Sequence, residues 1–129
     1  MNTNDCRFTG NLAADPEYGR TEGGATRVRF RIGVTKQVRN RQTQQWEDGP
    51  TTWIRCVAWG RLADNIAATF TRGMRVTVSG DLQQSSYTDR NGVDRTSYEL
   101  NVAQAGPDLT FATATVSRND RTADPEPEF

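Results

Sequence analysis

Three aromatic residues, Trp53, Trp59 and Tyr87, stand among polar and basic neighbours rather than in apolar runs. Arg55 lies between the two tryptophans. In an extended segment alternate side chains point to the same side, so Trp53, Arg55 and Trp59 would share one face. Aromatic faces stack on planar groups, and guanidinium groups both bind anions and stack on rings. The pattern predicts a surface that binds a flat, anionic ligand.

The other residue types offer little for catalysis. The chain contains no histidine, which removes Ser/His and Cys/His nucleophile arrangements and the usual general base at neutral pH. Its two cysteines, Cys6 and Cys56, are far apart in the sequence and have no histidine to complete a zinc site with them. We therefore predict buried free thiols in a reducing compartment, no metal, no cofactor and no enzymatic activity.

The charge of the chain is balanced overall but uneven along the sequence. The formal net charge is +0 and the pI is about 6.3, which by itself argues against a nucleic-acid partner. Residues 20–61, however, hold nine basic residues against three acidic ones. All but one of the basic residues in the chain are arginine, whose planar fork pairs with phosphate, although a GC-rich genome would also favour arginine. The clustering favours a nucleic-acid ligand.

Strands must position these side chains. Residues 6–12 have the composition of a first strand, and residues 27–34 alternate between arginine and apolar side chains, which is the clearest strand pattern in the chain. Residues 51–59 form a third predicted strand. The residues expected to face the interior from this third strand are Ile54, Cys56 and Ala58. Residues 39–50 are polar and include Asp48-Gly49-Pro50, which predicts a long, mobile hairpin loop.

The second half of the chain contains one helical pattern and further strands. Apolar residues recur at helical spacing across residues 62–70, and Gly73 follows as a C-terminal cap. Residues 74–80 alternate again, and Asn91-Gly92 is typical of the tip of a second hairpin. Residues 109–116 contain enough β-forming residues for an additional strand.

The predicted order is three strands, one helix and two strands. This order belongs to the OB-fold, whose barrel face and hairpin loops bind oligonucleotides or oligosaccharides. We therefore predict an all-β protein: a five-stranded OB-fold Greek-key barrel with one helix between strands 3 and 4 and an extra C-terminal strand. The domain would span residues 1–116, and residues 117–129 would form a short disordered acidic tail. The fold alone does not choose the ligand.

Short motifs stand at characteristic spacings along the chain. They are Gly10-Asn11-Leu12, Asp15-Pro16-Glu17, Trp53, Trp59-Gly60-Arg61-Leu62-Ala63, Gly73, Gly80-Asp81-Leu82, and Tyr87-Thr88-Asp89 with Gly92. Together they resemble the bacterial single-stranded DNA-binding protein family over about residues 5–116. Residues 106–116 resemble the actinobacterial branch, in which an extra strand clamps subunits together, or an actinophage member with a shortened tail. The resemblance implies a homotetramer of OB-folds that binds single-stranded DNA without catalysis.

The resemblance also implies a set of binding residues. The family's stacking aromatics fall on Trp53, Trp59 and Tyr87, and its phosphate-binding positions fall on Arg41, Arg55, Arg61, Arg72 and Arg95. A further aromatic falls on Val38, so that platform is missing, and Trp46 would either replace it or rest on the protein itself. The basic residues that precede the hairpin aromatic in the family are replaced by Gln83, Gln84, Ser85 and Ser86. We expect this hairpin to hold DNA more weakly, with compensation from Arg27, Arg29 and Arg31.

The C-terminal residues resemble a shortened form of the family's acidic tip, which ends in phenylalanine and recruits replication and repair proteins. The residues expected to bind partners are Asp124, Glu126, Glu128 and Phe129. Phe129 would enter an apolar pocket while its carboxylate meets a basic residue. A solvated tail without partners is the alternative.

The predicted function is sequence-independent binding and protection of single-stranded DNA during replication, recombination and repair. One alternative is an OB-fold adaptor of a replisome or primosome that binds nucleic acid only weakly. RNA is a further candidate ligand, because stacking does not sense the 2′-hydroxyl. Residues 1–5 lack the regions of a signal peptide and no apolar stretch is long enough to span a membrane. We predict a cytoplasmic, nucleoid-associated protein without a small-molecule substrate.

Overall fold

A computed structural model describes residues 5–119 of the chain, and these residues form six strands and one helix. The elements are β1 (Asp5–Leu12), β2 (Glu17–Arg20), β3 (Thr26–Arg39), β4 (Trp46–Trp59), α1 (Gly60–Thr69), β5 (Arg75–Thr88) and β6 (Asp94–Pro107).

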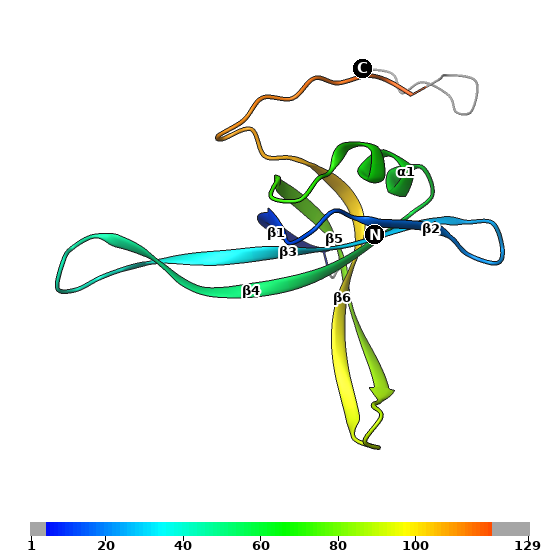
Figure 1. Cartoon of the computed structure of the whole chain (residues 1–129), viewed down its shortest axis with the longest axis horizontal. Helices are drawn as coiled ribbons and strands as arrows, with labels where there is room; N and C mark the ends of the chain where they lie inside the picture. The colour runs from blue at the N-terminus through cyan, green and yellow to red at the C-terminus, as the bar shows by residue number, and fades with distance from the viewer. Residues whose placement is uncertain (1–4, 120–129) are drawn as a thin grey trace.

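The strands form one sheet that closes on itself. Their order is β1-β5-β6-β4-β3-β2, and a further pairing of β1 with β3 joins the two sides (Figure 1). All pairings are antiparallel except the short parallel pairing of β4 with β6. This topology confirms the predicted Greek-key barrel, with α1 between its third and fourth long strands. The short strand β2 was not predicted, because its four residues are all exposed and show no apolar alternation.

The interior of the barrel follows from alternation along the strands. Apolar side chains of β3, β4, β5 and β6 point inward and are buried, and α1 closes the barrel with Ala63 and Ile66. The rings of Phe30 and Phe70 meet edge to face, with centroids 5.6 Å apart. Cys56 and Ala58 are buried as predicted, and Ile54 is half-buried. The predicted inward face of the third strand pattern is therefore correct.

Two long hairpins leave the barrel in different directions (Figure 1). The β3–β4 hairpin continues to Arg39 and Trp46, past an irregularity in pairing between Thr35 and Gln37. The prediction of a long loop at residues 39–50 was wrong, since strand pairing leaves only residues 40–45 as the connection. In the β5–β6 hairpin the predicted turn is confirmed, and Gly92 has a φ of 76°, a conformation that glycine adopts readily.

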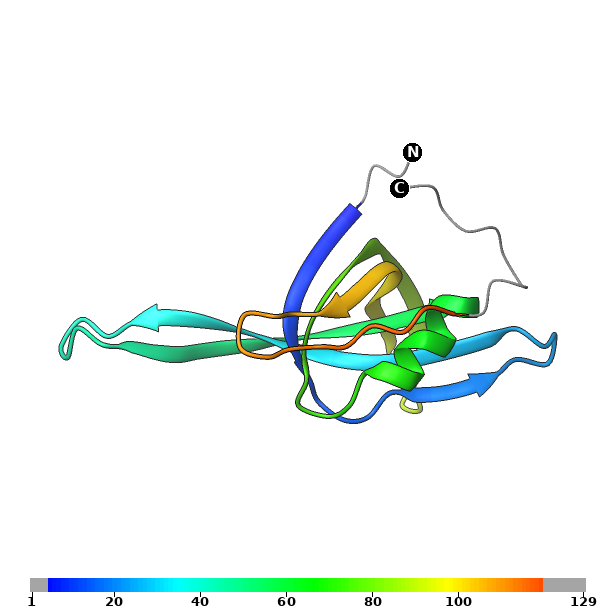
Figure 2. The same cartoon turned by 90° about the horizontal axis from the view of Figure 1, so that it is seen from above.

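After Pro107 the chain crosses the barrel beside α1 as an extended segment (Figure 2). Arg75 Nε donates to Asp108 Oδ2 at 2.6 Å, and the side-chain amides of Asn65 and Asn119 bond to each other at 2.8 and 3.0 Å. The prediction of an extra strand at residues 109–116 was wrong for the single chain, because no other part of the described chain offers this segment a backbone partner.

No helix among residues 5–119 combines the length and apolar character that crossing a membrane would require. The four residues predicted to bind partners, Asp124, Glu126, Glu128 and Phe129, lie outside the described residues.

Candidate nucleic-acid interface

The outward face of the β3–β4 hairpin brings arginines and tryptophans into register. Residues directly opposite each other in an antiparallel pair lie on the same face. The opposite pairs on this face are Arg27 with Trp59, Arg29 with Val57, Arg31 with Arg55, and Gly33 with Trp53. We call these eight residues the outer row. Two strands that alternate regularly thus place four of the predicted phosphate-binding arginines beside two of the predicted stacking rings.

The two tryptophan rings of the outer row are open to solvent on one side and contact arginine on another. Trp53 is 54% exposed and Trp59 is 45% exposed. The guanidinium carbon of Arg31 lies 5.2 Å from the centroid of Trp53, and that of Arg27 lies 5.8 Å from the centroid of Trp59. Both distances fall within the range of a cation–π contact. The rings can therefore stack with a further planar group while a positive charge stays close to it.

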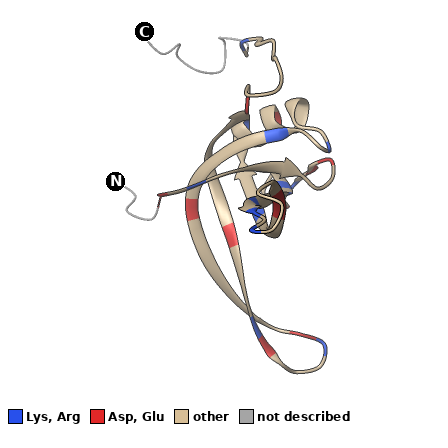
Figure 3. Cartoon of the chain, turned by 90° about the vertical axis from the view of Figure 1, so that its left-hand side faces the viewer, with Lys and Arg blue, Asp and Glu red and all other residues tan. Residues whose placement is uncertain are grey.

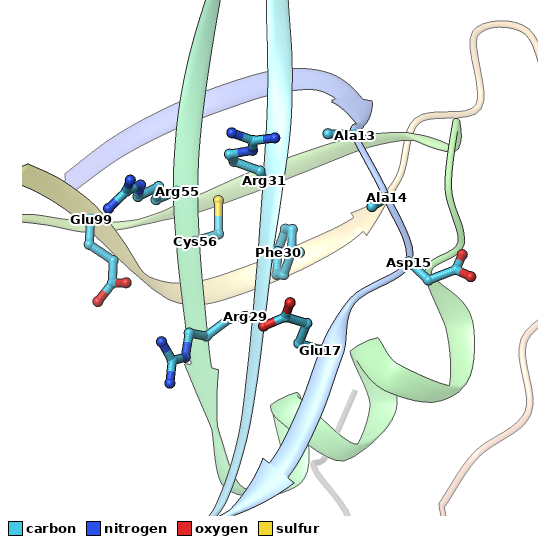
Figure 4. A pocket seen from close by; sticks show the side chains of 10 residues that line it. All are labelled: Ala13, Ala14, Asp15, Glu17, Arg29, Phe30, Arg31, Arg55, Cys56 and Glu99. Carbon is cyan, nitrogen blue, oxygen red and sulfur yellow. The ribbon is translucent and has the colours of Figure 1, made fainter.

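A polar hollow of about 420 Å³ adjoins the outer row (Figure 4). Arg29, Arg31 and Arg55 line it from β3 and β4, while three carboxylates, those of Asp15, Glu17 and Glu99, line it from the neighbouring segments. No carboxylate among residues 5–119 forms an ion pair with Arg29 or Arg55. Two guanidinium groups in the hollow are therefore available to an anion such as phosphate.

One residue of the outer row departs from the pattern. Val57 has the parity of the two tryptophans, yet it is only 6% exposed. Cys56 and Val57 are the residues through which β4 pairs with β6, opposite Leu100 and Asn101. At this point β4 is therefore paired on both sides, with β3 and with β6. The buried Val57 lies between the exposed rings of Trp53 and Trp59, so the two rings do not form one continuous open strip.

The remaining predicted phosphate-binding arginines are dispersed. Arg41 is exposed in the connection between β3 and β4, while Arg61 and Arg72 are exposed at the start of α1 and in the turn after it. The backbone N–H of Arg72 donates to Asp15 Oδ1 at 2.8 Å. Arg95 lies on β6. These four residues therefore lie outside the opposite pairs that make up the outer row, although Arg61 follows Trp59 by only two positions.

Tyr87 also lies apart from the outer row, on the β5–β6 hairpin directly opposite Arg95. Tyr87 is 50% exposed. Arg95 Nε donates to Asp89 Oδ2 at 2.9 Å, while Asp89 Oδ1 accepts from the backbone N–H groups of Asn91 and Val93. The Arg95 bond, followed by the Val93 N–H, holds the pKa of the Asp89 carboxyl below its ordinary value. Arg95 therefore already has an anionic partner.

Charges of both signs meet toward the end of the β5–β6 hairpin (Figure 3). Asp89, Arg90, Asp94 and Arg95 all lie within this stretch. The outer row on the other hairpin contains arginine but no acidic residue. This contrast agrees with the prediction that the β5–β6 hairpin binds an anion more weakly.

Four exposed aromatic residues, Tyr18, Trp46, Tyr98 and Phe111, were not among the predicted site residues, and two of them lie on the long hairpins. Trp46 is 68% exposed and lies opposite Arg39, so it does not rest on the body of the protein. Tyr98 is 56% exposed on β6, although it shares the parity of the buried Leu100 and Val102. The hairpin leaves the barrel beyond Leu100, so inward parity no longer means burial there. Tyr98 pairs with Gln84, and the polar run of residues 83–86 is the sequence signal that would have placed it on an open hairpin.

The two thiols are both free. Burial raises the pKa of the Cys56 thiol to about 12, and the charge of Glu99 adds to the shift. Cys6 is only half-buried, which corrects the expectation that both are buried. Among residues 5–119, no group of three or more His, Cys, Asp or Glu side chains could hold a metal ion.

Five long strands form a closed barrel, and a helix stands between the third and the fourth of them. One outward face of the barrel carries aromatic rings and guanidinium groups. These features define a binding protein of the OB-fold class. Residues 3–108 match the family described as the single-strand binding protein family. The chain belongs to this family.

Individual relatives support this assignment. "Single-stranded DNA-binding protein 2" of Streptomyces coelicolor is 46% identical over 109 residues, which are 84% of this chain and 55% of the relative. The single-stranded DNA-binding protein of Mycobacterium tuberculosis is 43% identical over 114 residues, 88% of this chain and 70% of the relative. The chain thus spans about half of the first relative's length. Both relatives come from actinobacteria, which agrees with the predicted resemblance to that branch.

A solved structure is similar over the barrel. The small single-stranded DNA-binding protein of Streptomyces coelicolor has a TM-score of 0.72 and 32% sequence identity, covering 84% of this chain and 97% of that one. The similarity agrees with the barrel topology described above and with the predicted fold.

Proposed function

We propose that the chain binds single-stranded DNA without sequence preference and protects it during replication, recombination and repair. The outer row is the observation that supports this proposal. Two exposed indoles beside Arg27 and Arg31 suit a ligand that repeats a flat ring and a phosphate. A duplex keeps its base faces stacked inside the helix, so an unpaired strand fits the row better. The proposed activity is non-catalytic.

In the proposed mechanism, arginines first attract the strand and aromatic rings then hold its bases. Arg29 and Arg55 would take the phosphates beside the hollow, and Trp53 and Trp59 would stack with bases. Stacking contributes about 1–3 kcal/mol per base and tolerates any sequence, since every base has an aromatic face. Tyr87 would add a separate stacking position on the β5–β6 hairpin. The DNA strand would therefore contact the protein at two sites, one on each hairpin.

The direct test is a titration of intrinsic tryptophan fluorescence with oligo-dT at two salt concentrations. Stacking on Trp53 and Trp59 should quench the fluorescence strongly, and the affinity should fall as salt rises because phosphate contacts release counterions. Duplex DNA of the same length should quench little. An oligo-U titration separates DNA from RNA. If oligo-dT at low salt fails to quench, the proposed mechanism is wrong.

Several finer properties belong to the same proposal. The chain would act as a homotetramer in the cytoplasm, associated with the nucleoid. Residues 1–116 would form the binding and oligomerisation domain. Residues 117–129 would form an acidic tail that binds replication and repair proteins. Exposed Leu109, Phe111 and Val116 support further contacts between copies, since apolar side chains of this size are commonly covered in an assembly.

A further inference from the structure

The outer row contains one residue without a side chain, and it stands directly opposite a tryptophan. Gly33 pairs with Trp53 in the β3–β4 ladder. Directly opposite side chains in an antiparallel pair are in contact distance of each other. A glycine in the middle of a strand weakens it, so its presence here calls for a reason.

The Trp53 ring occupies the space that a side chain on Gly33 would need. A methyl group on the Gly33 Cα would lie 2.9 Å from Cζ3 and 3.2 Å from Cη2 of Trp53. These atoms belong to the outer, six-membered ring of the indole. The indole therefore leans across the ladder and rests on the bare backbone of β3, and any larger residue at position 33 would lift it.

The crossing of β1 over β3 does not account for this glycine. At that crossing it is a side chain on Gly10 that would collide, at 2.4 Å from the carbonyl oxygen of Gly33. The space on Gly10 is needed for the two backbones to approach. The missing side chain of Gly33 points instead to the outward face, toward Trp53 and Thr51.

We infer that Gly33 is a positioning residue for DNA binding: it lets the outer ring of Trp53 rest against β3, beside Arg31, and so sets the position in which the ring meets the ligand. This inference rests on the proposed function, in which Trp53 stacks with a base. Arg31 lies two residues before Gly33 on the same face, and its guanidinium carbon is 5.2 Å from the ring centroid. Seating the ring thus also sets its distance from a positive charge that can meet the neighbouring phosphate.

The test compares two glycine substitutions. Gly33→Ala adds the methyl group that meets Trp53, whereas Gly19→Ala adds a methyl group on β2 that meets nothing within 4 Å. We expect Gly33→Ala to bind oligo-dT at least about fivefold more weakly, the effect of losing about 1 kcal/mol of stacking, with less quenching and an unchanged salt slope. Gly19→Ala should match the unsubstituted protein.

A second comparison keeps the test valid if Gly33→Ala folds poorly. Phenylalanine at position 53 lacks the outer ring that meets the methyl group, so Gly33→Ala should have no effect on affinity in a Trp53→Phe background. Equal losses in both backgrounds would overturn the inference, as would equal affinities of Gly33→Ala and Gly19→Ala while Trp53→Ala binds weakly. An unchanged affinity of Trp53→Ala would overturn both the inference and the stacking role proposed for this ring.

Discussion

Trp53 and Trp59 share one face of β4 but have different neighbours across the ladder. Arg27 stands opposite Trp59, whereas Gly33 stands opposite Trp53 and Arg31 reaches that ring from a diagonal position. A diagonal neighbour is more distant than an opposite one but is still within reach of a long side chain. The two rings therefore combine the same chemistry with different local supports, and each can be tested alone.

Replacing either ring should weaken binding by a similar amount. Trp53→Ala and Trp59→Ala should each cost about 1–3 kcal/mol of binding free energy for oligo-dT, because each loses one stacked base. Trp53→Phe keeps an aromatic face and should lose less than Trp53→Ala. Fluorescence anisotropy of a labelled oligonucleotide measures all three affinities without relying on the removed tryptophan. Losses of the same size for alanine and phenylalanine would argue against stacking.

For single residues, the sequence predicted which face of the strand each side chain occupies, but not which residue lies opposite it on the neighbouring strand. Alternation alone placed Trp53, Arg55 and Trp59 outward and Cys56 and Ala58 inward. The register of β3 against β4 was needed to pair Gly33 with Trp53. No local pattern contains that register, and a long loop at residues 39–50 would have left it open.

The two hairpins differ in whether their arginines form ion pairs with acidic residues. In the β3–β4 hairpin, Arg29 and Arg55 have no acidic partner among the residues described. In the β5–β6 hairpin, Arg95 is held by Asp89, a residue that also shapes the turn. The sequence indicated the weaker hairpin from its neutral residues before Tyr87. Weaker binding by this hairpin stays a prediction, and the ion pair adds a reason for it that the sequence did not provide.

Releasing Arg95 should strengthen binding. Asp89→Asn keeps an oxygen that accepts from the backbone of Asn91 and Val93 but removes the charge that pairs with Arg95. We expect a few-fold gain in affinity for oligo-dT and a steeper salt dependence, by roughly 0.7 in slope for one more phosphate contact. Asp94→Asn is the matched control, since Asp94 lies on the same hairpin and accepts from Thr88 Oγ1 instead. Equal gains for both variants would point to a general charge effect.

The segment after β6 should loosen in acid. The Arg75 guanidinium, and then the Thr110 hydroxyl, hold the pKa of Asp108 below its ordinary value. A lowered pKa means that the stabilisation is complete above the ordinary value of about 3.9 and is lost as pH falls through the lower folded value. Asp108→Asn should therefore melt below the unsubstituted protein at pH 7 and at the same temperature once Asp108 is protonated. A constant difference in Tm across this pH range would contradict the role of the ion pair.

Element boundaries were the least predictable part of the fold. The helix and the turn at Asn91-Gly92 carry strong local signals and were correctly placed. The C-cap of the helix is Phe70 in an extended conformation, however, so the predicted cap at Gly73 was wrong. The outer halves of β3 and β4 are polar because they project beyond the barrel, so their composition resembles a loop. Residues 109–116 have the composition of a strand, but composition cannot supply a backbone partner.

For the whole molecule, the barrel leaves apolar side chains uncovered on the segment after β6. Leu109 is 61% exposed and Phe111 is 84% exposed, with Arg75 over the Phe111 ring at 6.0 Å. The segment is anchored at Asp108 and at Asn119. Its position is therefore fixed at both ends while its apolar side chains face solvent, an arrangement suited to covering by another copy.

The proposed homotetramer predicts a definite mass in solution. Light scattering should give about four times the 14.4 kDa of the chain, an oligomer of closed symmetry being the usual outcome for identical subunits. Exchanging Leu109 and Phe111 for serine should reduce this mass if the segment joins subunits. A monomer in the unsubstituted protein would refute the proposed assembly.

The different directions of the two hairpins have a mechanical consequence. A single DNA strand that touches both the outer row and Tyr87 must bend on its way between the two hairpins. Pulling on the ends of the strand would straighten it, so tension works against simultaneous engagement. Because the β5–β6 hairpin has its arginine already paired, we expect a stretched strand to leave Tyr87 first and to remain on Trp53 and Trp59. The protein would then respond to the force on its DNA by loosening in two stages.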